Sequence, residues 1–596
     1  MSKDLGIPNT NKGTFETTGS FLTGGFGNGF TEFAGDGGPF IVRSTNLYFA
    51  DSVTVVKASH TLKAGTEIRP RFLETIDGGR SGFLKGALNY GDNNTGNAQA
   101  DMLLGTFAPQ AQSGTVPGGL FHPRQQEYGF FVQDDWKVSP KLMLNLGLRY
   151  DLFTPPTEKD GRFGNFDPKV GRVIVAGGKG DSLVSTDKNN WGPRAGFAYA
   201  INKDMVIRGG YALLYTVEGN EYPPLLRNVP FTNQVFYNNF GGAPSTFSFT
   251  TGPPVAPIGD PARVTTDFAV YSVETHTTTP GIQQWNLTYQ WGFARDYSFD
   301  IGYVATRGKH LLATRNLGNQ GQGLGLARNF EGKVFDTDKI YENRASSHYD
   351  SMQIQVQKRE SHGLIGSVAY TWSHNIDEST GEFGGLGDFR GSSGGPIDPF
   401  CFRCERGNSS LDVRHLMAAR LLYDLPFGKG RAFELSGPVD KILGGWQTNF
   451  IFTARTGFPF TVSYHDATTD LDTRPDQIGD PFQGVPAGLF LNPKAFGPAK
   501  RTVTNLAGKN LAVGNVGRNT FTGPGYFRTD FSVLKKTKLT EAAEMHFGME
   551  FFNLFNQVHV LTPNSGIDLN NPNNGFGKFF YALPPRTIQY RLKFVF

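Results

Sequence analysis

The feature that most constrains the fold is a strict two-residue alternation of apolar and polar side chains. One face of segment 141–151 carries Leu142, Leu144, Leu146, Leu148 and Tyr150, while the other carries Lys141, Asn145, Gly147, Arg149 and Asp151. The same alternation recurs in 283–293, 351–357 and 586–596. A helix cannot place such a pattern on one face, whereas a strand does so at every second residue. The alternation therefore predicts an all-β protein with one apolar sheet face.

About fifteen segments read as strands of this kind, the element from which a large antiparallel transmembrane β-barrel is built. The predicted strands are 47–57, 60–69, 125–138, 141–152, 192–201, 204–216, 281–293, 296–306, 348–359, 362–374, 411–424, 445–457, 526–536, 543–556 and 586–596.

The connections between these strands alternate in length. Short turns fall at 57–60, 138–141, 202–204, 294–296 and 360–362, and long loops at about 70–124, 153–191, 217–280, 307–347, 375–410, 458–525 and 557–585. Outer-membrane barrels have short periplasmic turns and long extracellular loops. Segment 425–444 is the exception, because it is a longer excursion on the short-turn side.

Composition agrees with this class. The 76 Gly residues favour turns and loops, and the 52 Phe and 21 Tyr favour strands. A net charge of +4 gives no argument for nucleic-acid binding. No apolar run of about 18 residues predicts a transmembrane helix, and the first residues have no signal-peptide pattern.

Aromatic residues cluster near the predicted strand ends, as expected of the girdles at both membrane interfaces. The alternative is aromatic packing in the core of a soluble β protein, although the polar alternate face argues for a wet lumen. We place Tyr150, Tyr215, Trp372 and Tyr423 toward the long loops, and Trp136, Trp446 and Phe293 toward the short turns.

Several segments carry a family likeness. They are FFVQDDWKVSPKLMLNLGLRYD (130–151), YDSMQIQVQKR (349–359), VAYTWSHNID (368–377), LGGWQTNFIFTARTGFPFTV (443–462), MEFFNLFNQ (549–557) and the terminal RLKFVF (591–596). Together they make the chain resemble TonB-dependent outer-membrane transporters of the Oar-like branch. Full members of that branch carry a carboxypeptidase-regulatory-like domain before the plug.

The resemblance implies parts that this sequence does not show: a signal peptide, a TonB box and a plug domain. Large outer-membrane transporters have about 22 strands, so we expect about 15 of 22 strands here, no plug, and an N-terminal truncation. The first and last predicted strands would both run toward the periplasm and leave a gap between them. We divide the chain into a Gly-rich extracellular loop region, 1–46, and the C-terminal part of the barrel, 47–596.

Few residues suggest chemistry. Cys401 and Cys404 form a lone C-x-x-C in a long outer loop, which favours a loop disulfide over a metal site. His374, Asp377 and Glu378 could chelate a cation, but a polar loop base is the plainer interpretation. No catalytic constellation, nucleotide motif, cofactor site or metal site stands out, so we predict that the chain is not an enzyme.

The predicted function is energy-coupled uptake of an oligosaccharide, peptide or metal chelate across the bacterial outer membrane. The alternatives are a plugless surface adhesin or display barrel, and a soluble secreted carbohydrate-binding β protein. The expected partners are outer-membrane lipid and lipopolysaccharide, the barrel-assembly machinery, and TonB through the missing N-terminal region. Loop aromatics that would suit a ligand, or only loop packing, are Tyr222, Phe236, Tyr237 and Phe240. The resemblance also implies an assembly signal in the last strand, at Tyr590, Leu592, Phe594 and Phe596.

Overall fold

The fold is seen in a computed structural model of the whole chain. The structure describes residues 23–26, 41–76, 87–90, 95, 97, 100, 104, 110–115, 119–168, 170–217, 226–238, 258–262, 270–316, 339–378, 401–466, 471–504, 510–568 and 574–596. None of the helices within these ranges is long and apolar enough to cross a membrane.

The dominant element is one nineteen-stranded sheet. Four of its strands are short pieces at the long-loop end, namely β2 (Ile41–Asn46), β9 (Thr157–Glu158), β15 (Tyr271–Val273) and β20 (Gly407–Asn408). The other fifteen are β3 (Phe49–Lys57), β4 (His60–Ile76), β7 (Pro123–Ser139), β8 (Leu142–Phe153), β12 (Trp191–Ala200), β13 (Met205–Tyr215), β16 (Gly281–Ala294), β17 (Tyr297–Asn316), β18 (Lys339–Ser361), β19 (Leu364–Asp377), β21 (His415–Asp424), β22 (Trp446–Arg455), β31 (Tyr526–Lys538), β32 (Glu544–Phe552) and β34 (Thr587–Val595).

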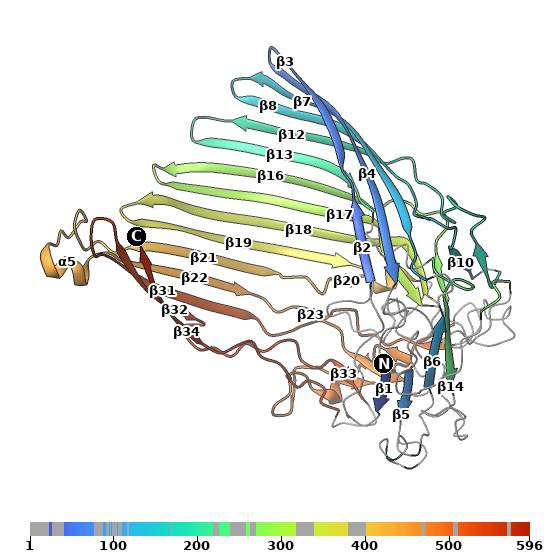
Figure 1. Cartoon of the computed structure of the whole chain (residues 1–596). Coiled ribbons are helices and arrows are strands. Elements are labelled where there is room, and N and C mark those ends of the chain that lie inside the picture. Colours follow the sequence, from blue (N-terminus) through green and yellow to red (C-terminus); the bar gives the residue numbers. More distant parts are fainter. Residues whose placement is uncertain are drawn as a thin grey trace.

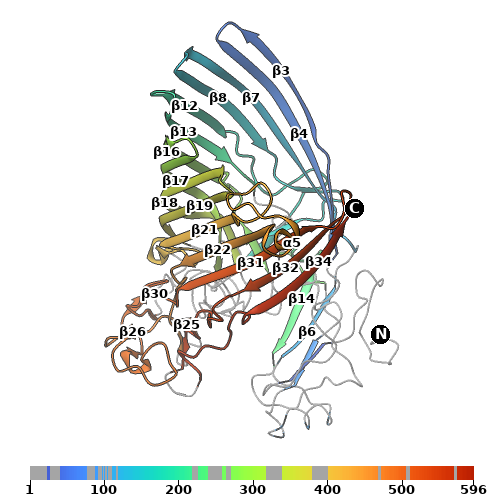
Figure 2. The ribbon, with the colours of Figure 1, turned by 90° about the vertical axis from the view of Figure 1, so that its left-hand side faces the viewer.

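These fifteen strands pair antiparallel in chain order, each with the next. Figures 1 and 2 show that the sheet curls into a wall with a concave and a convex side. Each of the fifteen predicted strands is therefore confirmed, although the ends of several differ from the prediction. We call this sheet the wall.

The wall has two edges. Within the described residues, β3 pairs with β4 alone and β34 with β32 alone, and every residue of both strands is exposed. Both edge strands end on the short-turn side, at Lys57 and Val595. The expected gap between the first and last strands thus corresponds to two edges without a partner strand among the described residues.

Some boundaries differ from the sequence-based prediction. β4 continues to Ile76, β17 to Asn316, and β18 begins at Lys339, whereas the predicted boundaries were 69, 306 and 348. Residues 41–46, which we had placed in the Gly-rich region, form β2 and pair with the far end of β4. In β17 and β18 the extension follows a register shift between Gly308 and Leu312, which interrupts the two-residue pattern that marks a strand.

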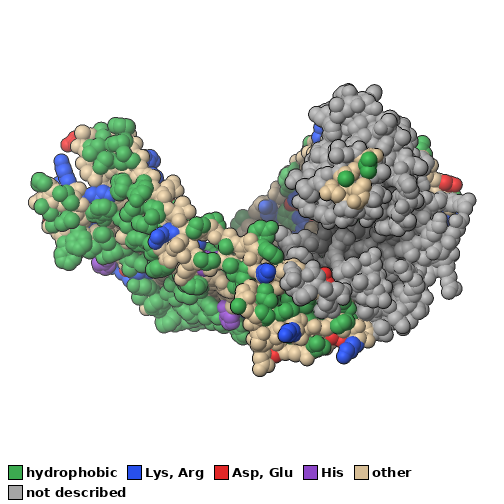
Figure 3. All heavy atoms as spheres, turned by 90° about the horizontal axis from the view of Figure 1, so that it is seen from below, with side chains coloured by type: hydrophobic (Ala, Val, Ile, Leu, Met, Phe, Trp, Pro, Cys, Tyr) green, Lys and Arg blue, Asp and Glu red, His purple; other side chains and the backbone are tan. Residues whose placement is uncertain are grey.

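The two faces of the wall differ as the alternation predicts. On β8, Leu146 and Leu148 are exposed on the convex side, and hydrophobic side chains gather over that side of the wall in Figure 3. The alternate residues Asn145 and Arg149 lie on the concave side, where Asn145 Nδ2 donates to Asp135 Oδ1 at 2.6 Å. One face is apolar and the other carries a polar network.

Aromatic residues lie at both ends of the wall, as predicted, but the predicted end is wrong for one of them. Tyr150 packs on Trp191 with ring centroids 4.6 Å apart toward the long loops, and Trp136 stacks on His60 beside the first short turn. The placement of Tyr423 was wrong, because Tyr423 pairs with Leu364 beside a short turn. Strand β21 descends from a long loop, so its last aromatic residue lies at the opposite end from the one assumed.

Candidate functional site

Charged side chains gather on the concave face, near the long-loop end of β4, β7 and β8. Their positions follow from alternation, because residues 67, 69 and 71 of β4 all point to the same side. We call the space that they line the charged hollow. It has a volume of about 180 Å³ and its lining includes Glu67, Arg69, Arg71, Glu127, Arg149, Asp151, Arg194 and Tyr215.

Arg149 links β8 to β4 across β7 in this hollow. Its Nε donates to Asp151 Oδ1 on its own strand at 2.8 Å, and its Nη2 donates to Glu67 Oε2 on β4 at 3.0 Å. The guanidinium reaches β4 by crossing β7 at Gly129, where a Cβ would lie 2.3 Å from Nη2. A side chain at 129 would therefore displace Arg149, so glycine here serves a close approach rather than a turn.

A second ion-pair group continues the cluster along β4. Arg71 Nε lies 2.6 Å from Glu127 Oε1, and Arg69 Nη2 lies 3.1 Å from Glu67 Oε2. Arg194, on β12, is exposed, lines the same space and forms no salt bridge with another described residue. The hollow thus carries four guanidinium groups and three carboxylates, an excess of positive charge facing the concave side.

A smaller space lies next to the charged hollow, among the long loops. This outer hollow has a volume of about 70 Å³ and is lined by loop residues that include Thr154, Pro155, Pro156, Asp187, Thr277, Thr279 and Asn343. Phe153 and Val217 line both spaces. The two hollows therefore adjoin, and together they lead from the loops to the charged part of the wall.

The described parts of the long loops contribute to apolar clusters of their own, of which two are large. One core joins loops that are distant in sequence, and consists of Phe163, Val184, Leu226, Val273, Leu312 and Tyr341. The other is built by segments 458–525 and 557–585, and consists of Phe460, Val462, Tyr464, Leu491, Ala495, Phe496, Val516, Phe521, Ile567 and Phe576. These cores hold the loops in place above the wall.

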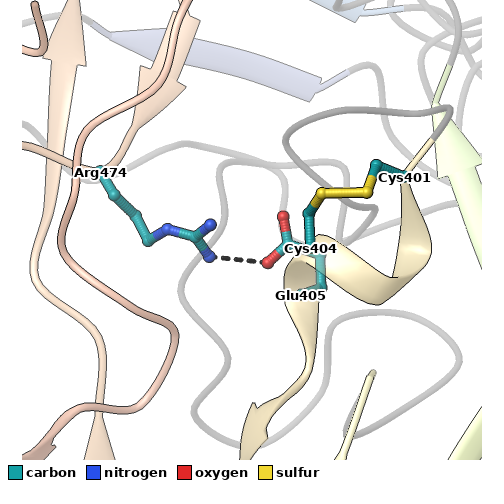
Figure 4. The surroundings of a disulfide bond; sticks show 4 residues. All are labelled: Cys401, Cys404, Glu405 and Arg474. Atoms are coloured by element: carbon teal, nitrogen blue, oxygen red, sulfur yellow. Dashed lines mark hydrogen bonds and ion pairs between the residues drawn. A yellow bond between two sulfur atoms is a disulfide. The ribbon is translucent and has the colours of Figure 1, made fainter. Parts of the chain in front are cut away.

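Buried charges join a third loop to the second core. Cys401 and Cys404 form a disulfide across the short helix η3 (Phe402–Glu405), which presents Glu405 to Arg474 (Figure 4). Arg474 Nη1 donates to Glu405 Oε2 at 2.7 Å, and both side chains are almost fully buried. Arg518 donates to the Glu405 carbonyl at 2.7 Å and also to Asp377. This junction fixes helix η3 and the end of β19 against segment 458–525.

The polar residues at the end of β19 have protein partners. Asp377 is paired with Arg518, His374 Nε2 lies 3.0 Å from Asn408 Oδ1, and Glu378 Oε2 accepts the N–H of Ser346 at 2.9 Å. The hydrogen bonds of these three residues are directed to different protein groups. These three residues therefore take part in the polar packing at the base of the loop.

One group of possible ligands has its ligating atoms within 4.8 Å of one another, His122, Glu158 and Asp160. The carboxylate of Glu158 already accepts three backbone N–H groups, from His122, Asp160 and Arg162, at 2.7–3.0 Å. Burial alone would raise the pKa of Glu158, but these donors and the Arg162 guanidinium outweigh burial and lower it. The Glu158 carboxylate therefore holds a turn through its hydrogen bonds to the backbone.

Of the four loop aromatic residues that the sequence suggested for ligand binding, two belong to a described strand. Tyr222 and Phe240 lie outside the described residues. Phe236 and Tyr237 belong to β14 (Asn233–Asn238), which pairs with β6 (Gln110–Thr115) in a small sheet with β1 (Thr23–Phe26) and β5 (Ala87–Tyr90).

The sequence-based search missed the charged hollow, although Arg149, Asp151 and a glycine inside a strand were signals for it.

The residues expected to form an assembly signal lie on one face of the last edge. Tyr590, Leu592 and Phe594 occupy alternate positions of β34, and Phe596 follows the strand with 94% of its surface exposed. Ile588 shares their register and is also exposed. This edge therefore presents an unbroken apolar row on the convex side.

Comparisons with known proteins agree with this architecture. A solved structure of the outer membrane transporter YddB from Escherichia coli matches with a TM-score of 0.51 at 8% identity, over 96% of this chain and 58% of that one. The FrpB iron transporter from Neisseria meningitidis matches with a TM-score of 0.43 at 11% identity, over 94% and 56%. The ferric-catecholate import receptor Fiu from Escherichia coli K12 gives 0.42 at 11%, over 93% and 55%.

The chain thus spans a little over half the length of these structures. The comparison with curated proteins gave no match. A family model described as "Outer membrane beta barrel domain" matches residues 1–589, which confirms the predicted placement in the outer membrane. The match to YddB confirms that the fold resembles that of an outer-membrane transporter. This chain belongs to the outer membrane beta-barrel domain family.

Proposed function

We propose that the chain forms part of the wall of an energy-coupled outer-membrane transporter. The observation that carries the proposal is the pair of adjoining hollows, which share Phe153 and Val217. A ligand caught among the folded loops would meet the charged hollow next. Interior sites of large membrane barrels need few but well-placed polar groups to orient a ligand.

The charge of the inner hollow suggests what kind of ligand would pass. Arg194 faces the hollow beside three guanidinium groups that are already paired with carboxylates. An anionic group on the ligand would balance the excess charge and accept two hydrogen bonds from one guanidinium. The proposed substrate is therefore an acidic oligosaccharide, peptide or metal chelate.

The wall needs further strands to work. An edge in lipid leaves backbone N–H and C=O groups without partners, at several kcal/mol for each group. Edges β3 and β34 run in the same direction, so an antiparallel closure requires an odd number of added strands. We propose that about seven strands complete a barrel of about 22. A plug and a TonB box would belong to the same complete protein, and TonB would supply the work of uptake.

Growth of the native bacterium tests the function. Panels of acidic oligosaccharides, peptides and ferric chelates as sole nutrient should include one whose use requires both this gene and TonB. Within that assay, Arg194→Ala should weaken uptake by about tenfold or more, because losing one charge-assisted hydrogen bond to the anion costs about 1.5–3 kcal/mol. Lys63→Ala is the matched control, since Lys63 faces the same lumen but lies over the Phe131 ring.

The second candidate is a plugless adhesin or display barrel. The two loop cores favour it, because a folded outer surface suits binding without transport. Two results together would replace the transporter proposal with this one. Growth on every nutrient in the panel would be independent of TonB, and deletion of the gene would abolish cell adhesion. Outer-membrane levels of each variant must match those of the native protein in both assays.

A further inference from the structure

One part of the molecule does not follow the rule of short turns. Residues 425–444, here named the rim excursion, connect β21 to β22 on the side where the other connections are a few residues long. The excursion contains helix α5 (Gly437–Leu443) and projects beyond the short turns, near the C-terminus (Figure 1). Neither transport nor loop packing accounts for it.

The rim excursion is internally held, so its surface has a defined shape. Gly428 donates to the Phe433 carbonyl at 3.0 Å, and Phe433 donates to the Pro426 carbonyl at 2.8 Å. The backbone of Lys429 donates to Asp440 Oδ1 at 2.9 Å. Gly428 has a φ of +126°, and a Cβ there would lie 3.0 Å from the Cα of Gly444. The two ends of the excursion are thus in close contact.

Two contacts attach the excursion to the outward-facing side of the wall. Trp446 shares its register with the outward residues of β22, and its indole N–H donates to the Ile442 carbonyl at 2.8 Å. Trp446 pairs with Lys535 on β31. The Nζ atom of Lys535 donates to the Gly444 carbonyl and lies 5.7 Å from the centroid of the Trp446 ring. A lysine on the lipid-facing register is therefore covered, being only 8% exposed.

The surface that remains is apolar. Phe427 and Phe433 stack with ring centroids 5.3 Å apart and are both exposed. On α5, Val439, Ile442 and Leu443 are each at least half exposed. Five large apolar side chains of one short segment are thus exposed at the short-turn rim. Exposed patches of this kind on folded segments mark contacts with a membrane or a partner.

We propose that the rim excursion is an interfacial anchor whose apolar side chains insert into the periplasmic leaflet of the outer membrane. Continuity selects lipid as the occupant, because the excursion is bonded to Trp446 and Lys535, two residues on the outward register of the wall, and tryptophan favours the membrane interface. Charge agrees, since Lys429 and Lys441 are exposed and suit phospholipid phosphates. The anchor would fix the depth of the wall in the membrane.

Site-directed spin labelling of the complete protein in isolated outer membranes tests the anchor. Cys401 and Cys404 are bonded to each other, so a cysteine introduced by Ile442→Cys or Val439→Cys would be the labelled residue. The ratio of oxygen to water-soluble nickel-chelate accessibility should be several-fold higher at 442 and 439 than at Glu434→Cys, an exposed control in the same excursion. It should approach the ratio at Leu421→Cys, an outward residue of β21.

The outcomes separate the possible occupants. A ratio at both 442 and 439 equal to that at 434 would overturn the proposal. Protection at 442 from both reagents, with a photo-crosslink from that position to another protein, would also overturn it and assign the surface to a protein partner. Labels at two positions guard against one variant that disturbs the helix. Neither outcome would depend on whether the chain transports a substrate.

Discussion

The wall and the loops above it bury apolar side chains in different media. Leu148 on the wall is 41% exposed and lies between Val132 and Pro193 on the neighbouring strands, so only lipid can cover it. Phe460 in the loops is 3% exposed and is covered by other loop residues. The wall therefore takes its apolar environment from the membrane, whereas the loops build their own.

Because of this difference, the wall and the loops require different patterns of apolar residues in the sequence. A strand in lipid needs the same alternation along its whole length, whatever its neighbours are. A loop core needs a few apolar residues that meet only after folding, such as Phe460 and Phe576. The two regions should therefore respond in different ways to substitution, and the experiments below are ordered by the size of the expected effect.

The largest effect is expected at Phe596, after the last strand of the wall, where a change should affect assembly into the membrane rather than stability. Phe596 is 94% exposed, so removing it deletes almost no contact within the protein. If the last strand is the signal read by the assembly machinery, deleting Phe596 should still lower the outer-membrane level of the complete protein several-fold. Quantitative blots of membrane fractions against total synthesis measure this.

The matched controls keep or move the aromatic ring. Phe596→Trp should retain the membrane level, because an aromatic residue remains at the end. Phe580→Ala removes an exposed aromatic residue from a loop and should change nothing. An unchanged membrane level after deletion of Phe596 would contradict the assembly role of this strand.

Sequence reasoning recovered the wall because its information is local. All fifteen strands were predicted, and the errors lie where alternation stops, at the extensions of β4, β17 and β18. The misplacement of Tyr423 had a different cause, since it depended on the direction of β21 rather than on the pattern.

The loops and the charged hollow were not predictable in the same way. Arg518 and Asp377 are 141 residues apart in sequence, and no periodicity links them. Arg149 was visible as a polar residue of β8, but its contact with Glu67 depends on Gly129 in the strand between them. Such contacts are set by register across strands, which a single sequence does not state.

The next experiment tests the face and depth of the wall. Leu148 lies between the level of Leu144, paired with Trp136, and that of Tyr150, paired with Phe130. Leu148→Arg should lower the free energy of unfolding in phospholipid vesicles by about 2–4 kcal/mol, because a guanidinium near the midplane meets acyl chains. Leu146 is a weaker choice, since Asp134 lies opposite and could pair with the new arginine.

Asn145→Arg is the control on the lumen side. Asn145 donates to Asp135 at 2.6 Å, so an arginine there would face water and a carboxylate. Its unfolding free energy should stay close to that of the native protein. Equal losses from Leu148→Arg and Asn145→Arg would show that the two faces have been assigned wrongly.

The smallest effect is expected in the loops, at the turn held by Glu158. Glu158→Gln leaves a single carbonyl oxygen where two carboxylate oxygens accept the N–H groups of His122, Asp160 and Arg162. The turn should lose about 1–3 kcal/mol at neutral pH. Hydrogen exchange of the three amides measures that loss, and Asp160→Asn is the control because its carboxylate is 47% exposed.

The pH dependence of this loss has a definite sign. The pKa of Glu158 is lower in the folded loop than its ordinary value, so its carboxylate stabilises the turn above that value, and the stabilisation disappears as pH falls through the folded pKa. The difference in exchange between Glu158→Gln and the native protein should therefore be constant near neutrality and shrink below about pH 4. An amide in the middle of β8 should show no such change, because Glu158 holds a turn at the long-loop end of the wall, on the short strand β9. A constant difference down to low pH would mean that shape, rather than charge, holds the turn.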